Sequence, residues 1–289
     1  MTLEILISTL DEGINNVPAM LLEQREGIGY VVSWQHSEGK EVAMPSQLKR
    51  DDVKVCDLAG RGLSRNRNNG LRNATADVCL IADDDCRYTH ERLQTVIDTF
   101  AQNPEVDIAT FQFEGAGSTK TFPKKTFNLS TFPKGYFVSS IEIALRRKSV
   151  VNKIWFNENF GLGAQVFHCG EEHIFIQDAL SQGLTCMFFP ITIVSENDST
   201  ISISRDVESG TLMAHGAMMH LYNPKTKYLR VLIKAYRLWR KRNVPLFKAL
   251  RHMNNGIKYI KSHPEMMKTT SSSTYSPQNV ASSYQSCLS

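Results

Sequence analysis

The sequence of 289 residues carries 33 Lys and Arg against 29 Asp and Glu, which gives a formal net charge of +4. Its 42% apolar and 21% charged residues match ordinary globular composition, and this excludes a wholly disordered chain. Six cysteines are too few for a disulfide scaffold, and the length predicts one large domain or two closely joined ones.

Short apolar runs alternate with helical patterns in the first part of the chain. Strands are predicted at residues 3–8, 30–34, 53–56, 78–82 and 108–113. One helix is predicted to begin at Pro18, and another after the capping residue Thr89. Strands that alternate with helices predict an α/β fold with a mostly parallel sheet.

The second part of the chain contains fewer strands and more helix. Further strands are predicted at residues 137–144 and 187–194, with a helix over 171–182 that Gly183 ends. Residues 227–261 have a helical pattern with few acids. The Ser-rich sequence after Thr269 is predicted to be a disordered tail.

The net charge conceals a division of the chain. Residues 224–268 contain thirteen Lys and Arg and one acid, Glu265, so this segment carries a net charge of +12. The rest of the chain has 20 bases and 28 acids, a net charge of −8. We therefore expect the basic segment, rather than the acidic body, to meet an anionic partner.

The N-terminus shows no targeting segment. The apolar run at residues 3–8 has no basic stretch before it and is too short for a signal peptide or a membrane span. The cysteine spacings include no CxxC pair, which argues against a zinc site. We therefore expect a cytoplasmic protein with reduced thiols.

Three adjacent acids, Asp83, Asp84 and Asp85, directly follow the predicted strand at residues 78–82. Ligands bind at the carboxyl ends of strands in open α/β sheets, and carboxylates suit Mg²⁺ or Mn²⁺ that is shared with a substrate phosphate. A solvated acidic turn would explain the same residues. The sequence before them decides between these interpretations.

That sequence reads Gly-Leu-Ser-Arg-Asn-Arg-Asn-Asn-Gly over residues 62–70. It resembles the inverting family 2 glycosyltransferases of the GT-A fold, in which G-L-S-x-x-R-N-x-G precedes an apolar strand and a D-x-D motif. The resemblance implies that Asp83 and Asp85 hold a divalent cation on the diphosphate of a nucleotide sugar. It also places Arg67 and Asp84 at the donor, although Arg67 could instead be an exposed helix charge.

A second motif of the same family follows later in the chain. A loop with Gly161 and Gly163 precedes Gly-Glu-Glu at residues 170–172. The resemblance makes this an acceptor loop, Glu172 the general base and Glu171 its orienting neighbour. Inverting transfer needs such a base, because the acceptor hydroxyl loses its proton as its oxygen attacks the anomeric carbon. The preference of acids for a first helical turn would explain one glutamate, but not the glycine loop.

The first strand also resembles the family, whereas the second departs from it. Ser8 and Thr9 stand where the family has a pair beside the base and ribose, and Asp11 follows closely. The family's nucleobase-binding Asp is missing from the end of the second strand, and Gln35 is expected to hydrogen bond the base instead. A metal-side histidine that sometimes follows the acidic helix is also missing around Asp198. The resemblance covers about residues 3–215.

The basic segment combines its charge with an apolar stripe made of Leu229, Leu232, Ile233 and Tyr236. Such a helix can lie on an anionic bilayer over residues 227–261, or it can pack its stripe on the body. No RNA- or DNA-binding motif accompanies the charge, so nucleic acid is not expected. Members of the resembled family often act on lipid-linked sugars at the inner face of the membrane, which favours the bilayer.

Together these features predict a glycosyltransferase at the cytoplasmic face of a membrane. We expect transfer from a UDP-, GDP- or dTDP-linked sugar to a lipid-linked or polysaccharide hydroxyl. The expected parts are a GT-A domain at 1–215 (donor half 1–115, acceptor half 116–215), a basic helical extension at 216–268 and the tail at 269–289.

Two alternatives remain open. A nucleotidyltransferase can share the sheet, but residues 8–13 lack the glycine-rich, lysine-containing loop that such enzymes usually carry. The other alternative is a non-enzymatic nucleotide-sugar or nucleic-acid binding protein that uses the basic segment.

Overall fold

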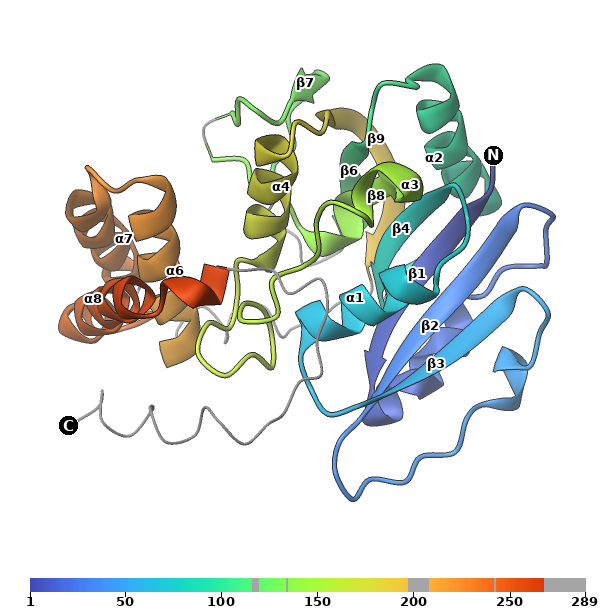
Figure 1. Cartoon of the computed structure of the whole chain (residues 1–289), viewed down its shortest axis with the longest axis horizontal. Coiled ribbons are helices and arrows are strands. Elements are labelled where there is room, and N and C mark those ends of the chain that lie inside the picture. Colours follow the sequence, from blue (N-terminus) through green and yellow to red (C-terminus); the bar gives the residue numbers. More distant parts are fainter. Residues whose placement is uncertain (116–119, 134, 197–207, 242, 268–289) are drawn as a thin grey trace.

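The computed structural model describes residues 1–115, 120–133, 135–196, 208–241 and 243–267. The predicted tail at 269–289 and the position of Asp198 lie outside these ranges. Within them the chain forms one central sheet with helices on both faces, and the helices of residues 209–262 are gathered at one end (Figure 1). The predicted α/β fold is confirmed.

The sheet has the strand order β3-β2-β1-β4-β8-β6-β9-β5 in the described ranges, and β7 pairs with β9. Strands β3, β2, β1 and β4 run parallel, as do β6 and β9, whereas β8 is antiparallel to both β4 and β6. The strands are β1 (Leu3–Leu10), β2 (Ile28–His36), β3 (Val53–Ala59), β4 (Val78–Asp83), β5 (Cys86–Arg87), β6 (Ile108–Gly115), β7 (Phe127–Asn128), β8 (Ile143–Arg146) and β9 (Cys186–Glu196).

Helices cover the two faces of this sheet and continue at its end. The α-helices are α1 (Leu63–Asn73), α2 (His90–Gln102), α3 (Arg147–Val150), α4 (Glu171–Ser181), α6 (Ser209–Tyr222), α7 (Lys227–Arg240) and α8 (Leu246–Ser262). The 3₁₀ helices are η1 (Asp11–Met20), η2 (Ser46–Leu48), η3 (Ser140–Glu142) and η4 (Pro264–Met267).

The central strands are buried on both sides, which explains their continuous apolar runs. In β1, Ile5 and Ile7 join the core on the side of η1 and α2, whereas Leu6 joins the core on the side of α1 and α4. Successive side chains of a strand point to opposite faces, so one short run supplies two cores.

Two predicted elements were wrong. No α-helix starts at Pro18, because η1 ends at Met20. The buried residues Ile14, Val17 and Met20 of η1 are spaced by three, which is the period of a 3₁₀ helix. The strand predicted at 137–144 is irregular over 137–139 and is followed by η3, where Ser139 and Glu142 form a reciprocal cap; of the predicted residues, only the last two belong to a strand, β8.

Other boundaries follow local signals. Thr89 accepts a hydrogen bond from the Arg92 amide (3.3 Å) and caps α2, as predicted. Gly183 adopts a φ of +73° just beyond α4, a conformation that favours glycine.

The C-terminal helices pack on one another and on residues within 116–215, the predicted acceptor half. The α6 and α8 backbones approach so closely that a Cβ on Gly216 would collide with the Met253 carbonyl, and one on Gly256 with that of Met213. The predicted boundary between residues 215 and 216 falls inside α6. Residues Phe160 and Phe167 share a buried cluster with α6 and α8, so the extension is continuous with the acceptor half.

Candidate active site

The parallel strands bring their carboxyl ends to one edge of the sheet. Ser8 of β1 lies level with Ser33 of β2 and with Asp83 of β4. Helix α1 packs on β1, β2 and β3, and its buried residues include positions 64, 67, 68 and 71, which share one face of the helix. This spacing is one helical stripe, yet it contains Ser64, Arg67 and Asn68, so polar groups occupy a core position here.

Arg67 lies at the centre of the site and is only 1% exposed. Its Nη1 donates to Glu171 Oε1 at 3.1 Å and to Glu172 Oε1 at 3.4 Å, and its Nη2 donates to Asp83 Oδ1 at 3.3 Å. Burial by itself lowers the pKa of Arg67, but the surrounding carboxylates raise it overall, so the guanidinium remains charged. The alternative that Arg67 is an exposed charge on the surface of a helix is therefore excluded.

The two glutamates of α4 differ in their surroundings. Glu171 is 4% exposed, and its buried Oε2 has no hydrogen-bond partner in the part of the chain that the structure describes. The Glu172 side chain is 19% exposed and lies farther from Arg67. Burial raises the pKa of Glu172, and the adjacent charge of Glu171 raises it further, against the opposing effect of Arg67.

Two stacked phenylalanine rings, Phe156 and Phe175, pack beside the Arg67 cluster. The Arg67 guanidinium lies 5.6 Å from the centre of the Phe156 ring, which stacks on Phe175 of α4 at 4.2 Å. Asn68 donates to the Phe156 carbonyl and accepts from its amide, both at 2.9 Å. The rings and the amide therefore fix α1 against the helix that carries both glutamates.

The three adjacent aspartates point to different partners. Asp83 is 38% exposed at its side chain and makes long contacts, to Arg67 at 3.3 Å and to Ser140 Oγ at 3.4 Å. Asp84 turns inward, accepts from Thr9 Oγ1 at 2.5 Å and has a pKa raised by burial. Asp85 is half-buried. The hydrogen bond to Thr9 sets Asp84 apart from Asp83.

Asp83 and Asp85 are the residues predicted to hold a divalent cation. No group of three His, Cys, Asp or Glu side chains is arranged around a common point in the described ranges. Magnesium-type sites commonly use one or two carboxylates and complete their coordination with substrate phosphates and water. Asp83 and Asp85 fit that type of site, because the Asp83 carboxylate is accessible and only weakly engaged.

The two glycines of the predicted acceptor loop lie directly against α1 and α4. Gly161 has a φ of +107°, and a Cβ there would lie 2.9 Å from Ser64 Oγ and 3.0 Å from Glu171 Cδ. Gly163 has a φ of +81° and would place a Cβ 3.1 Å from the Gly62 amide nitrogen. Glycine is required at both positions for conformation and for space, so the loop passes beside the carboxylate cluster.

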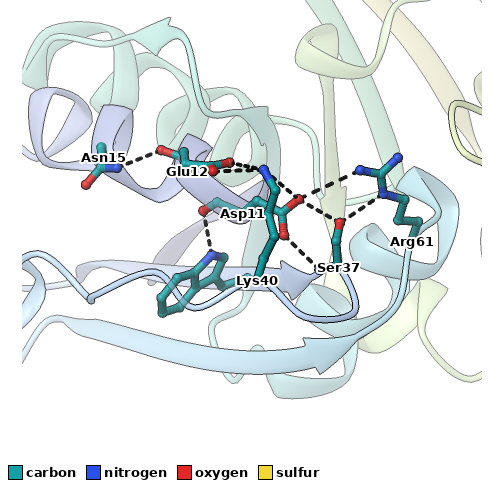
Figure 2. Close-up of polar contacts among 7 residues, drawn as sticks. Asp11, Glu12, Asn15, Ser37, Lys40 and Arg61 are labelled. Atoms are coloured by element: carbon teal, nitrogen blue, oxygen red, sulfur yellow. Dashed lines mark hydrogen bonds and ion pairs between the residues drawn. The ribbon is translucent and has the colours of Figure 1, made fainter.

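Asp11 forms a second polar network at the end of β1. Its carboxylate accepts from the Ser37 amide at 2.7 Å and from Ser37 Oγ at 2.6 Å, with Lys40 Nζ and Arg61 Nη2 at 3.8 and 3.9 Å. Figure 2 shows these side chains converging on the Asp11 carboxylate. Burial raises its pKa, but the Ser37 hydrogen bonds and the two cations lower it overall.

Two other residues predicted at the donor site, Gln35 and Thr9, have buried side chains that contact the protein. Gln35 is 2% exposed and donates through Nε2 to the Gly62 carbonyl at 3.2 Å. Nucleobase recognition by Gln35 stays a prediction, and this backbone contact does not favour it. Thr9 is also buried. Its hydroxyl donates a hydrogen bond to Asp84, and its carbonyl accepts one from Asn66.

Several site residues were missed from the sequence. Ser64 Oγ donates to the Phe160 carbonyl at 2.6 Å and ties α1 to the acceptor loop, a role that its position one turn before Arg67 could have signalled. Lys120 and Glu142 form a buried ion pair with 6% and 0% exposed side chains. This pair anchors η3, whose Ser140 contacts Asp83, and no local pattern links residues 22 positions apart.

With this geometry in place, the chain can be compared with known proteins. Residues 36–161 match the family model described as Glycosyl transferase family 2. The match includes α1 and the three aspartates, and it ends at Gly161, before the two glutamates of α4. No curated protein sequence shows significant similarity to the chain.

Solved structures share the fold over most of the chain. The crystal structure of S. aureus TarS 1-349 has a TM-score of 0.50 at 12% identity, covering 93% of this chain and 92% of that one. The TarS 1-349 complex with UDP-GlcNAc has a TM-score of 0.50 at 13% identity, with coverages of 91% and 92%. A longer TarS structure gives 0.51 at 14% identity, and the chain spans 55% of its length. At these identities the likeness establishes the fold, which is that of GT-A glycosyltransferases.

Proposed function

We propose that the chain is an inverting glycosyltransferase that moves a sugar from a nucleoside-diphosphate donor to a hydroxyl of a lipid-linked or polysaccharide acceptor. The observation that carries this proposal is the Arg67 cluster. One guanidinium joins Asp83, at the end of the nucleotide-binding strands, to Glu171 and Glu172, at the start of the acceptor-side helix. The donor-side carboxylate of Asp83 and the acceptor-side carboxylates of Glu171 and Glu172 thus contact the same guanidinium.

Glu172 is the proposed general base. Its carboxylate takes the proton of the acceptor hydroxyl while that oxygen bonds to the anomeric carbon and the bond from this carbon to the diphosphate breaks. Its raised pKa suits the role, because a base works best with a pKa near the operating pH. Glu171, held by Arg67, is proposed to orient the reacting groups rather than to take the proton.

Asp83 and Asp85 are the proposed ligands of Mg²⁺ or Mn²⁺. When bound, such an ion would neutralise the charge of the departing diphosphate. Ser8, Thr9, Asp11 and Asp84 would shape the donor side from the ends of β1 and β4, with Gln35 a weaker candidate because of its backbone contact. Asp84 and Thr9 act on each other and so would position this edge rather than coordinate an ion.

The donor base and the cellular site are part of the same proposal. UDP, GDP and dTDP sugars are all compatible with the residues at the strand ends, and the UDP-GlcNAc held by the S. aureus TarS structure makes a UDP sugar the first to test. No helix in the described ranges is long and apolar enough to cross a membrane. We propose a cytoplasmic location at the membrane face, where a lipid-linked acceptor would be reached.

Two measurements test the proposal. Calorimetry with UDP, GDP and dTDP, each with and without Mn²⁺, is expected to find one nucleotide whose affinity rises with the ion. Donor turnover should release nucleoside diphosphate, whereas a nucleotidyltransferase would release or consume pyrophosphate. Failure of all three nucleotides to bind would overturn the donor-site assignment.

Isosteric variants then separate the roles. Glu172→Gln should lower turnover by about 10²–10⁴ with nucleotide affinity unchanged, because only proton transfer is lost. Asp85→Asn should weaken the ion-dependent part of nucleotide affinity. Glu105→Gln is the matched control, since Glu105 is exposed in the turn after α2. Full turnover in both site variants would contradict the mechanism.

A further inference from the structure

The apolar stripe of α7 does not pack on the body in the part of the chain that the structure describes. Leu229, Leu232, Ile233 and Tyr236 are 59%, 50%, 42% and 47% exposed. The helix packs instead through Val231, Ala235 and Leu238, which contact α8 and its neighbours. Of the two arrangements open from the sequence, the one that buries this stripe against the protein is therefore excluded for these residues.

Further apolar side chains extend this surface. Tyr228 and Trp239 on α7 are about as exposed as the stripe, and Phe247 at the start of α8 is 83% exposed. A hollow of about 900 Å³ lies along α7, lined by Leu232, Tyr236, Leu246 and the stems of Lys234 and Arg237. Apolar area of this extent on a folded protein marks an interaction site.

The same surface is strongly and uniformly basic. Neither α7 nor α8 contains an acid, and the exposed cations of these helices and the adjoining turn include Arg230, Arg237, Arg240, Lys241, Lys248 and Arg251. Basic groups that flank exposed Leu, Ile, Tyr and Trp side chains are typical of a helix that lies in the interface of a bilayer. We propose that the α7–α8 face, the exposed residues just named, docks on an anionic lipid bilayer.

Charge complementarity selects the bilayer over other occupants. A second copy that met this surface through the same face would place it against an identical basic one, with no acid on α7 or α8 to pair with the cations. Residues 268–289 contain one lysine and no acid, so they do not complement the surface either. Anionic headgroups supply the missing charge, at about 1 kcal/mol for each cation near the membrane surface, and acyl chains take up the apolar stripe.

The docking face is also tied to the acceptor side of the molecule. Phe160, Phe167 and Ile174 form a buried cluster with Met213, Ala214 and Tyr259 of α6 and α8. Gly170, which precedes Glu171, packs against Met218 of α6 so closely that a Cβ there would collide. A bilayer bound at α7 would therefore hold the acceptor loop at a fixed distance from its surface.

The test is co-sedimentation of the full chain with phosphatidylcholine vesicles, with and without phosphatidylglycerol. Binding should require phosphatidylglycerol and decline with added salt. Leu232→Ser/Ile233→Ser should weaken binding by about tenfold or more, since it removes apolar area that the bilayer buries. Arg237→Gln/Arg240→Gln should weaken it by about tenfold, and Met44→Ser, also exposed and apolar but remote, should leave it unchanged.

Each other result would overturn the proposal. Equal binding to neutral vesicles would remove the role of charge, and no vesicle binding would remove the bilayer. A dimer that the Leu232→Ser/Ile233→Ser change dissolves would assign the face to a second copy, and tighter binding to RNA or DNA than to vesicles would assign it to nucleic acid. Nucleotide affinity should be unchanged in all variants, so failure of this test would remove the proposed membrane location but not the proposed sugar transfer.

Discussion

The Arg67 cluster and the α7–α8 face arrange charge and apolar groups in opposite ways. At the cluster, one buried guanidinium is surrounded by three carboxylates and supported by the Phe156 ring. On the α7–α8 face, cations and large apolar side chains are exposed together, with no acid on either helix.

The difference shows what each region has to bind. Burying a charge costs free energy unless it is paired, so the charged groups of the Arg67 cluster are paired with one another inside the protein. The exposed cations and apolar side chains of the α7–α8 face make few stabilising contacts with the rest of the protein. Binding an amphipathic partner would pair the cations and remove the apolar area from water. The first region suits chemistry and the second suits attachment.

The largest expected effect comes from breaking the cluster with Arg67→Met. The change leaves Asp83, Glu171 and Glu172 without their common cation, and the loss of one partner of a buried ion pair costs about 3–5 kcal/mol. Urea denaturation should show that decrease in the free energy of unfolding.

The control is Arg72→Met on the same helix. Arg72 has a 42% exposed side chain, and Glu158 is 3.9 Å away, so the expected loss is about 1 kcal/mol or less. Equal losses in the two variants would show that the Arg67 cluster contributes no more than a surface pair.

A smaller effect is expected where the extension is held to the body. Gly216→Ala would place a methyl group on the Met253 carbonyl and should cost about 1–3 kcal/mol through overpacking. Thermal unfolding of this variant should be compared with Gly70→Ala, where a Cβ would lie 3.5 Å from Leu6 Cβ and a helix former replaces glycine. Destabilisation by Gly70→Ala instead of Gly216→Ala would contradict the described α6–α8 packing.

The smallest expected effect is a shift of the pH profile. The proposed base Glu172 can take a proton only when deprotonated, and its pKa lies above the ordinary value, so kcat/KM should fall about tenfold per pH unit below that raised pKa. Glu171→Gln removes a neighbouring negative charge, so the pKa of Glu172 should decrease and the acidic limb should move to lower pH. An acidic limb that stays in place would show that Glu172 does not set it.

Much of the fold and part of the site could be read from local sequence. The buried runs at residues 3–8 and 78–82, the Thr89 cap and the first turn of α4 all depend on neighbours a few positions away. The motif containing Arg67 and the acids after β4 were found for the same reason. Where a distant contact decided the structure, prediction failed: Glu142 pairs with Lys120 inside the protein, and its segment forms η3 instead of a strand.

An α/β chain, a basic C-terminal segment and the residue types of a carboxylate site follow from the amino-acid order, because periodicity, charge and short motifs are properties of adjacent residues. The contacts of Arg67 with Asp83 and both glutamates depend on the folded chain, since these residues come from separate elements. The folded chain also determines that Val231, Ala235 and Leu238, rather than the longer apolar stripe, face α8. A helix has several faces, and which one is buried depends on the partner it meets, not on its own periodicity.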